Sequence, residues 1–481
     1  MATVAKGPAQ NWGFFLDGGW STEGETVDIR SPYDSSLVGT VHCATAAHAE
    51  AAVRAAQRAF ETTRKSSSSE RQRILREISA GIQARREEFA RTMALEAGKP
   101  VRTARVEVDR AVLTFSVAAE EATRIGGEWL PLDLQPSTAG RAGIVRRFAL
   151  GPVLGITPFN FPLNLVAHKV APAIAAGCTI IVKPAPQTPM CSFILAEIVE
   201  KAGLPAGALN VLPLTNPDAE RLVADDRLKL LSFTGSGPIG WALKAKAGKK
   251  KVVLELGGNA AVIVHSDADI DDAARRCVQG GFSYAGQSCI SVQRIFVQRA
   301  VEGKFIDVLV GGVKQLKMGD PLDEATDIGP MINEEAARRA AAWIEEAVAG
   351  GGKLLCGGTR KGSLLEPAVL THTQPQMKVN CQEIFAPVVV VEPYDTFEEA
   401  IRRTNDSPYG LQAGVFTRDA KLLFEAFENL EVGGVIAGDV SAFRSDPMPY
   451  GGVKESGLGR EGLRYAIEEM TESRLLVLNL A

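Results

Sequence analysis

The chain has 481 residues, of which 46% are hydrophobic and 23% are charged, and its formal net charge is −4. This composition predicts a globular protein of about three domains and excludes a coiled coil, a collagen and a disordered chain. The near balance of charges gives no sign of a nucleic-acid-binding protein. The seven cysteines show no C-x-x-C spacing, so we expect free thiols, no metal site and a cytoplasmic location.

Helices dominate the N-terminal part of the chain. Apolar residues recur at helical spacing over 47–62, and a second helix is expected over 70–90. Ser67 and Glu70 have the spacing of a capping box at its start. A third, longer helix is expected over 102–124. The uncharged stretch 148–167 contains several prolines and glycines, so it indicates a turn-rich segment and not a membrane span.

From residue 150 onward, short apolar runs alternate with helical patterns. Strands are expected at 153–157, 178–183, 208–213, 228–234, 252–255 and 261–265, with helices up to 176 and over 188–202, 217–224 and 238–247. This alternation predicts right-handed βαβ units around a parallel sheet. A second alternation extends from about 270 to 440, and the final LLVLNL run indicates a strand.

A glycine-rich turn follows one of these strands. Residues 235–240 read GSGPIG and open a helix, which is the setting of a dinucleotide-binding fingerprint. In that interpretation the pyrophosphate lies on the helix N-terminus and Glu255 binds the ribose. The alternative is a tight turn whose glycines serve packing only.

Five further motifs carry chemistry-bearing side chains at strand ends or in loops. They are TPFNFP around Asn160, VKPA around Lys183, LELGGN around Glu255, YAGQSC ending at Cys289 and QEIFAP around Glu383 and Phe385. Together they resemble the aldehyde dehydrogenase superfamily, in family order and with family-like spacing, from roughly residue 12 to the C-terminus.

The resemblance implies a catalytic set that agrees with the chemistry. Cys289 would attack the aldehyde, because a thiolate is the best side-chain nucleophile near neutral pH. The Asn160 amide and the Cys289 backbone N–H would form the oxyanion hole. Glu255 would be the general base for thioester hydrolysis. The alternatives are an inert buried thiol, a turn-forming asparagine and a ribose-binding glutamate.

The resemblance also implies NAD or NADP as the cofactor. Lys183 would bind the adenosine ribose, Glu383 the nicotinamide ribose, and Phe385 would lie beside the nicotinamide. Other implied cofactor contacts are Ile156, Thr157, Pro158, Gly235, Ser236, Ile239 and Leu256. NAD-preferring members carry glutamate where this chain has Pro186. Because such a carboxylate repels a 2′-phosphate, its loss makes NADP acceptable and leaves the cofactor preference open.

Three cationic or titratable residues map by resemblance to the substrate tunnel. Arg110, His168 and Arg444 favour a small hydroxylated or anionic aldehyde, as in lactaldehyde-type and phosphonoacetaldehyde-type members. Ser288 replaces the arginine of some phosphate-binding relatives, which disfavours a phosphorylated substrate. The alternative is that Glu107, Asp109 or Asp446 neutralises the arginines outside the tunnel.

The predicted fold is α/β, with a Rossmann-like cofactor domain, an α/β catalytic domain and a small β oligomerisation arm. The expected boundaries are 1–118 and 149–256, then 257–445, then 119–148 with 446–481. Arm strands pairing with a neighbouring subunit would give a homodimer or homotetramer. The expected reaction is oxidation of an aldehyde to the acid through a cysteine thiohemiacetal and thioester. A CoA-acylating enzyme and a catalytically silent structural member are the alternatives; Glu255 argues against the first, and the intact catalytic set against the second.

Overall fold

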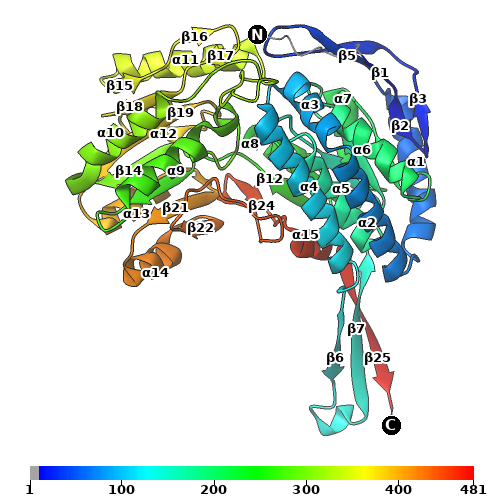
Figure 1. Ribbon diagram of the computed structural model, residues 1–481. Helices are drawn as coiled ribbons and strands as arrows, with labels where there is room; N and C mark the ends of the chain where they lie inside the picture. The colour runs from blue at the N-terminus through cyan, green and yellow to red at the C-terminus, as the bar shows by residue number, and fades with distance from the viewer. Residues whose placement is uncertain (1–9, 481) are drawn as a thin grey trace.

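The computed structural model describes residues 10–480. The first nine residues of the predicted cofactor domain, and Ala481 at the end of the predicted arm, lie outside this range. Two sheets covered by helices form the body, and a narrow three-stranded arm projects from it (Figure 1). No helix within the described range has the length and apolar character needed to cross a membrane.

The first sheet has eight strands, and its five central ones are parallel. In spatial order they are β24 (Gly457–Leu458), β12 (Lys251–Glu255), β11 (Leu230–Thr234), β8 (Val153–Ile156), β9 (Ile180–Lys183), β10 (Leu209–Val211), β2 (Phe14–Leu16) and β3 (Gly19–Ser21). The predicted strands of this region are therefore confirmed, with slightly shorter ends. Their continuous apolar character follows from burial on both faces of the sheet.

Eight helices accompany this sheet. They are α1 (Ala46–Thr63), α2 (Ser68–Ala84), α3 (Arg86–Ala97), α4 (Val101–Glu121), α5 (Asn164–Ala176), α6 (Met190–Lys201), α7 (Asn216–Ala224) and α8 (Gly237–Lys246). Ser67 caps α2 by accepting a hydrogen bond from the Glu70 N–H at 3.2 Å. The helix expected over 70–90 is broken at Arg85, whose φ of −106° and ψ of 23° leave the helical region. Its guanidinium there binds Glu88 and Glu197.

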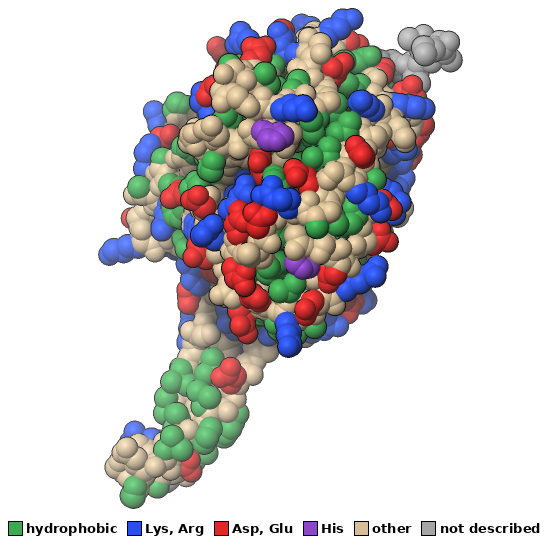
Figure 2. Space-filling view, turned by 90° about the vertical axis from the view of Figure 1, so that its left-hand side faces the viewer, with side chains coloured by type: hydrophobic (Ala, Val, Ile, Leu, Met, Phe, Trp, Pro, Cys, Tyr) green, Lys and Arg blue, Asp and Glu red, His purple; other side chains and the backbone are tan. Residues whose placement is uncertain are grey.

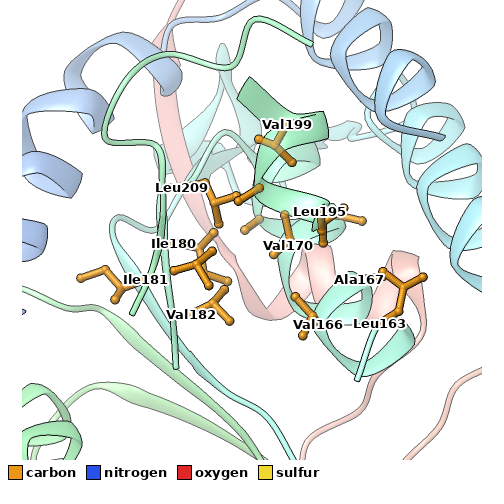
Figure 3. Packing of buried hydrophobic residues seen from close by; sticks show 14 of the residues in the cluster. Leu163, Val166, Ala167, Val170, Ile180, Ile181, Val182, Leu195, Val199 and Leu209 are labelled. Atoms are coloured by element: carbon orange, nitrogen blue, oxygen red, sulfur yellow. The ribbon is translucent and has the colours of Figure 1, made fainter. Parts of the chain in front are cut away.

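The packing of α5 and α6 on β9 anchors the front of this sheet (Figure 3). Val166 and Val170 of α5 lie near Ile180 and Val182 of β9 and Leu195 of α6, all at most 1% exposed. Burying each such side chain stabilises the fold by about 1.5–3 kcal/mol. This packing holds the start of α5, and with it the loop that carries Asn160.

The second sheet has seven strands, all parallel except the edge strand β15. Its order is β15 (Lys353–Cys356), β18 (Ala368–Thr371), β19 (Val388–Tyr394), β14 (Arg294–Gln298), β13 (Ala261–Val264), β21 (Gln412–Phe416) and β22 (Gly434–Ala437). Its helices are α9 (Ile270–Phe282), α10 (Glu302–Val313), α11 (Glu334–Ala349), α12 (Lys378–Cys381), α13 (Phe397–Asn405) and α14 (Ala420–Asn429).

Short strands complete the body. They are β1 (Gln10–Trp12) with β5 (Leu37–His42) and β4 (Thr26–Arg30), β16 (Arg360–Lys361) with β17 (Leu364–Leu365), and β20 (Tyr409–Gly410) with β23 (Val453–Lys454).

The arm differs from the prediction in two respects. It consists of β6 (Gly127–Pro131), β7 (Arg141–Ala149) and β25 (Thr471–Asn479), with β7 in the middle. The C-terminal strand was expected to pair with a neighbouring subunit, but β25 pairs with β7 of its own chain along nine residues, because this ladder satisfies the backbone internally.

The second correction concerns residues 446–470, which were assigned to the arm but lie in the body. Strand β24 pairs with β12, and α15 (Leu463–Glu469) contacts α4 and α5. The apolar residues Leu463 and Ile467 explain this placement, since both are buried in the core of the first sheet.

Candidate active site

One cavity of about 350 Å³ lies at the carboxyl ends of β8, β11 and β12, where open α/β sheets bind their ligands. Its lining includes the three predicted catalytic residues Asn160, Glu255 and Cys289. Other predicted residues in the lining are Arg110, Pro158, Gly235, Ser236, Leu256, Glu383, Phe385 and Arg444. The cavity thus brings part of the expected substrate and cofactor set together with the predicted catalytic residues.

The loop before Cys289 has an unusual backbone. Tyr284 and Ala285 have φ values of 50° and 53°, a left-handed conformation that costs free energy in non-glycine residues. The Tyr284 hydroxyl donates to the Ala97 carbonyl at 3.0 Å. The Gln287 side chain accepts from a backbone N–H of the neighbouring loop at 2.8 Å. These contacts hold the loop in its strained form and fix the position of Cys289.

The Cys289 thiol faces a tyrosine. Its Sγ lies 3.0 Å from the Tyr450 hydroxyl oxygen. Burial raises the pKa of Cys289 to about 12, so the thiol is protonated in the free enzyme at neutral pH. A nucleophilic role for Cys289 would therefore require the loss of this proton.

The Asn160 amide spans the gap between its own loop and the nucleophile loop. Its Nδ2 donates to the Gln287 carbonyl at 3.0 Å, which leaves the second N–H of the same nitrogen for another acceptor. Its Oδ1 is buried and has no hydrogen-bond partner among the described residues. The amide is held by the nucleophile loop, as an oxyanion-hole donor must be.

A buried ion pair contacts the backbone of Asn160. Lys99 pairs with Glu107, and its Nζ also donates to the Asn160 carbonyl at 2.7 Å. The same Nζ lies 3.9 Å from the ring centre of Phe161 and 4.4 Å from that of Tyr284. Glu107 accepts from two backbone N–H groups at the start of α5, at 3.0 and 3.1 Å. One cation thus connects the oxyanion loop to the nucleophile loop.

Glu255 ends β12 inside the cavity. Both carboxylate oxygens are buried without a hydrogen-bond partner among the described residues. Burial, and then the nearby Glu461 carboxylate, raise the pKa of Glu255 well above its usual value. A carboxyl group with a raised pKa is a stronger base once deprotonated, as a general base near neutral pH requires.

Arg444 belongs to a buried charge cluster at the substrate end. Its guanidinium lies 3.0 Å from a Glu461 oxygen and 3.8 Å from the ring centre of Tyr450. Glu461 also pairs with Lys169 at 3.3 Å, and these cations hold the pKa of Glu461 at about 2. The Nε of Arg444 is buried with no hydrogen-bond partner in the described part of the chain.

Arg110 lines the cavity, but His168 does not have the predicted place. Arg110 binds Asp446 through two nitrogens at 2.7 and 3.3 Å. His168 is 2% exposed and lies outside the cavity lining. Its Nε2 lies 2.8 Å from Asp446 Oδ1, the oxygen that also accepts from Arg110 Nη2. Burial lowers the pKa of His168, so this ring is neutral. Because its contact is Asp446, it positions the carboxylate that neutralises Arg110.

Backbone groups shape the end of the cavity that is expected to hold the cofactor. Glu383 accepts from the Gly258 N–H at 3.0 Å, and a Cβ on Gly257 would lie 2.3 Å from its other oxygen. Burial raises the pKa of Glu383 to about 7. Phe385 has a φ of 50° and packs edge-on against Phe159, with ring centres 5.9 Å apart.

The start of α8 gives this end a place for a phosphate group. Gly235 and Ser236 line the cavity there, and the Ser236 side chain makes no capping hydrogen bond. Free N–H groups at a helix start bind phosphate, so these residues fit a dinucleotide. The other predicted cofactor residues lie outside this cavity: Ile156 and Thr157 are buried at the end of β8, Lys183 donates to the Asn216 side chain at 3.3 Å, and Pro186 and Ile239 are exposed.

Comparison with known proteins decides the family. Residues 20–476 match the model of the aldehyde dehydrogenase family. The chain belongs to this family.

This aldehyde dehydrogenase is 44% identical over 472 residues to the 3-sulfolactaldehyde dehydrogenase of Priestia aryabhattai, covering 98% of each chain. A solved structure of aldehyde dehydrogenase 21 from Physcomitrella patens in complex with the reaction product succinate has 45% identity and a TM-score of 0.97, covering 98% of this chain and 99% of that one. Glyceraldehyde-3-phosphate dehydrogenase GapN from Methanocaldococcus jannaschii, complexed with NADP, has 39% identity and a TM-score of 0.92, covering 95% and 100%. The predicted family, α/β fold and NAD(P)-dependent aldehyde oxidation are confirmed.

The structure of this aldehyde dehydrogenase also shows site residues that the motifs did not single out. Tyr450 and Glu461 line the cavity, and Lys99 lies beneath the oxyanion loop. A signal was present for two of them: Tyr450 precedes two glycines, and Lys99 lies between Gly98 and Pro100. Glu461 has no comparable local signal, because its partners come from distant elements.

Proposed function

We propose that Cys289, Asn160 and Glu255 carry the reaction; the single observation behind this is that one buried cavity holds all three. Cys289 attacks the aldehyde carbon as the thiolate, and the new oxyanion receives N–H bonds from Asn160 and the Cys289 backbone. A bound NAD or NADP would supply the hydride acceptor for this carbon. Glu255 then deprotonates the water that attacks the resulting thioester, and Cys289 leaves as the thiolate.

We propose an anionic substrate from the charges around the cavity. Arg110, Lys169 and Arg444 carry three positive charges, and Asp446 and Glu461 carry two negative charges. Burial favours the neutral forms of Glu255 and His168. With both groups neutral, these side chains carry one positive charge in excess, and a buried excess charge is costly until an opposite charge arrives.

The relatives support this substrate class. One relative is named for 3-sulfolactaldehyde and another was solved with succinate; both compounds are small and anionic. A short aldehyde that carries a sulfonate or carboxylate group, with or without a hydroxyl group, belongs to the same class of small anionic compounds. Two cavity-lining arginines provide the donors for such a group.

The cofactor end supports the use of either nucleotide. Glu383 and Phe385 line the cavity and would hold the nicotinamide ribose and ring, and Lys183 at the end of β9 would bind the adenosine ribose. Pro186 is exposed and offers no carboxylate that would repel a 2′-phosphate. We therefore propose that NADP is accepted as well as NAD.

A cytoplasmic homodimer or homotetramer is part of this proposal. Figure 2 shows hydrophobic side chains gathered on the projecting arm. Arm residues at least half exposed include Trp129, Leu134, Leu475, Leu476 and Leu480, and both edge strands of the arm are unpaired on one side. A second copy that covers these residues would remove them from water. The seven cysteines are free thiols, which agrees with a reducing compartment.

The structure also supports a division of the chain close to the expected one. The first sheet with its helices would be the cofactor domain, the second sheet the catalytic domain, and the arm the oligomerisation element, with residues 446–470 counted in the body.

An aldehyde panel tests the function. NADH and NADPH formation is followed with glycolaldehyde, lactaldehyde, 3-sulfolactaldehyde, succinic semialdehyde, phosphonoacetaldehyde and hexanal, each with and without CoA. We expect a short anionic aldehyde to give the highest kcat/KM, without a need for CoA. Hexanal at the top of the ranking would contradict the substrate class, and a strict CoA requirement would favour the acylating alternative. No reduction with any aldehyde would favour a catalytically silent member.

A further inference from the structure

A second cavity, of about 900 Å³, lies where the arm leaves the body. The end of α1, the start of α2 and the arm strands β7 and β25 line it, and we call it the arm-base pocket. Its described lining contains no aspartate or glutamate and shares no residue with the catalytic cavity. Six side chains in it are cationic: Arg64, Lys65, Arg71, Arg146, Arg147 and Arg474.

Most of this positive charge has no ion-pair partner among residues 10–480. Arg64 pairs with Glu61 at 3.4 Å. Arg147 donates from Nε to the Thr471 hydroxyl at 2.7 Å and from Nη2 to the Glu468 carbonyl at 2.6 Å, and neither acceptor neutralises its charge. The remaining four cations form no ion pair within residues 10–480.

Two of these four face each other across the arm ladder. Arg146 of β7 is directly opposite Arg474 of β25, and both guanidinium groups lie over the Phe148 ring, 5.5 and 4.2 Å from its centre. Like charges directly opposite on neighbouring strands destabilise a sheet. Glu472, two residues from Arg474, does not line the pocket and is paired with Lys251 at 2.8 Å.

The body side of the pocket also offers donors. Serines 66–68 line it at the start of the 17-residue helix α2, where the helix dipole adds positive potential. Arg71 donates to the Ser68 hydroxyl at 3.3 Å, and its Nε is buried without a hydrogen-bond partner in the described residues. Cations and free donors therefore converge on one space from both the arm and the body.

We propose that the arm-base pocket binds a small molecule with a diphosphate group. The four unmatched cations, of which Lys65, Arg146 and Arg474 are exposed, offer binding groups to a multiply charged anion. Phosphate oxygens accept the paired N–H groups of arginine. Such a ligand joins Arg146 and Arg474 of the arm to Lys65 and Arg71 of the body. It thereby relieves the repulsion between the two opposed arginines and fixes the arm to the body.

Calorimetric titration with inorganic pyrophosphate tests this site. We expect one binding event per chain that survives saturation with NAD, since the start of α8 is the other place where a diphosphate could bind. Replacing both Arg146 and Arg474 by glutamine should weaken this event at least tenfold, and so should the body-side pair Lys65→Gln/Arg71→Gln. Arg141→Gln, on the same strand but outside the pocket, is the matched control and should leave the affinity unchanged.

Three results would overturn the proposal. One is equal pyrophosphate affinity in the wild type and both double variants. Another is loss of all binding once NAD is present, which would assign the anion to the catalytic cavity. The third is that pyrophosphate fails to bind while the double variants change the oligomeric state, which would mean that the pocket receives an acidic segment of a second copy. Because no pocket residue lines the catalytic cavity, unchanged aldehyde oxidation verifies that each variant is folded.

Discussion

The two ends of the catalytic cavity are built in different ways. At the substrate end, Arg110, Arg444 and Glu461 are each fixed by a buried partner. At the cofactor end, glycine backbone at 235 and 257 and the left-handed Phe385 make the space. Charge is thus preorganised where the chemistry occurs, and shape is preorganised where a large cofactor enters. Changes at the first end should alter rates and selectivity strongly, and changes at the second should alter binding mildly.

The largest loss is expected from Cys289→Ala. Without the sulfur there is no covalent intermediate, so aldehyde oxidation should fall by at least about 10³-fold, while NAD binding measured by fluorescence stays near the wild-type value. Substantial turnover by this variant would refute the covalent mechanism.

Glu255→Gln should separate hydride transfer from hydrolysis. We expect a rapid burst of NAD(P)H followed by a steady-state rate lower by about 10²–10⁴-fold. The carboxylate is the active form and its pKa is raised, so the wild-type hydrolysis rate should increase as the pH rises through that pKa. Stopped-flow measurements across pH should find no such increase of the hydrolysis rate in Glu255→Gln. An unchanged steady-state rate in this variant would exclude Glu255 as the base.

Lys99→Met tests whether the buried pair positions the oxyanion amide. Leaving Glu107 unpaired should destabilise the fold by about 3–5 kcal/mol, and kcat should fall by about ten- to a hundredfold with KM little changed. If Lys99 has a structural role alone, Lys99→Met should lower kcat by the same factor in the Asn160→Ala background as in the wild type. If Lys99 acts through Asn160, the double variant loses no more than Asn160→Ala does, and Lys99→Arg restores part of the rate.

Arg444→Met should change substrate ranking more than overall rate. The excess positive charge disappears, so the kcat/KM ratio of succinic semialdehyde to hexanal should fall by about 10–100-fold. A ratio is the right readout because any effect of the freed Glu461 on Glu255 acts on both substrates. An unchanged ratio would show that Arg444 serves the fold and not the substrate.

The smallest effect is expected from Pro186→Glu. The position is exposed, so solvent screens the new carboxylate, and the NADP/NAD ratio of kcat/KM should fall only about three- to tenfold. Pro186→Gln is the uncharged control. A ratio that does not move would place residue 186 away from the ribose.

Sequence patterns predicted the parts of this protein that depend on nearby residues. Strand β9 and helix α5 follow from local apolar periodicity. The short motifs around Asn160, Glu255 and Cys289 pointed to three residues that line one cavity, and their catalytic roles stay predictions. The role of His168 was misjudged because its partner Asp446 lies 278 residues away. For the same reason Glu461 was missed and β25 was assigned to a neighbouring subunit: its ladder partner β7 precedes it by more than three hundred residues.

The position of β25 has a practical consequence for protein engineering. The described chain ends at the tip of the arm (Figure 1), where the Leu480 N–H donates to the Gly140 carbonyl at 2.7 Å. A fluorescent protein or an immobilisation tag attached there would stand among the exposed apolar residues of the arm. Gln10, at the far side of the body, is the better attachment point for a sensor that must keep its assembly intact.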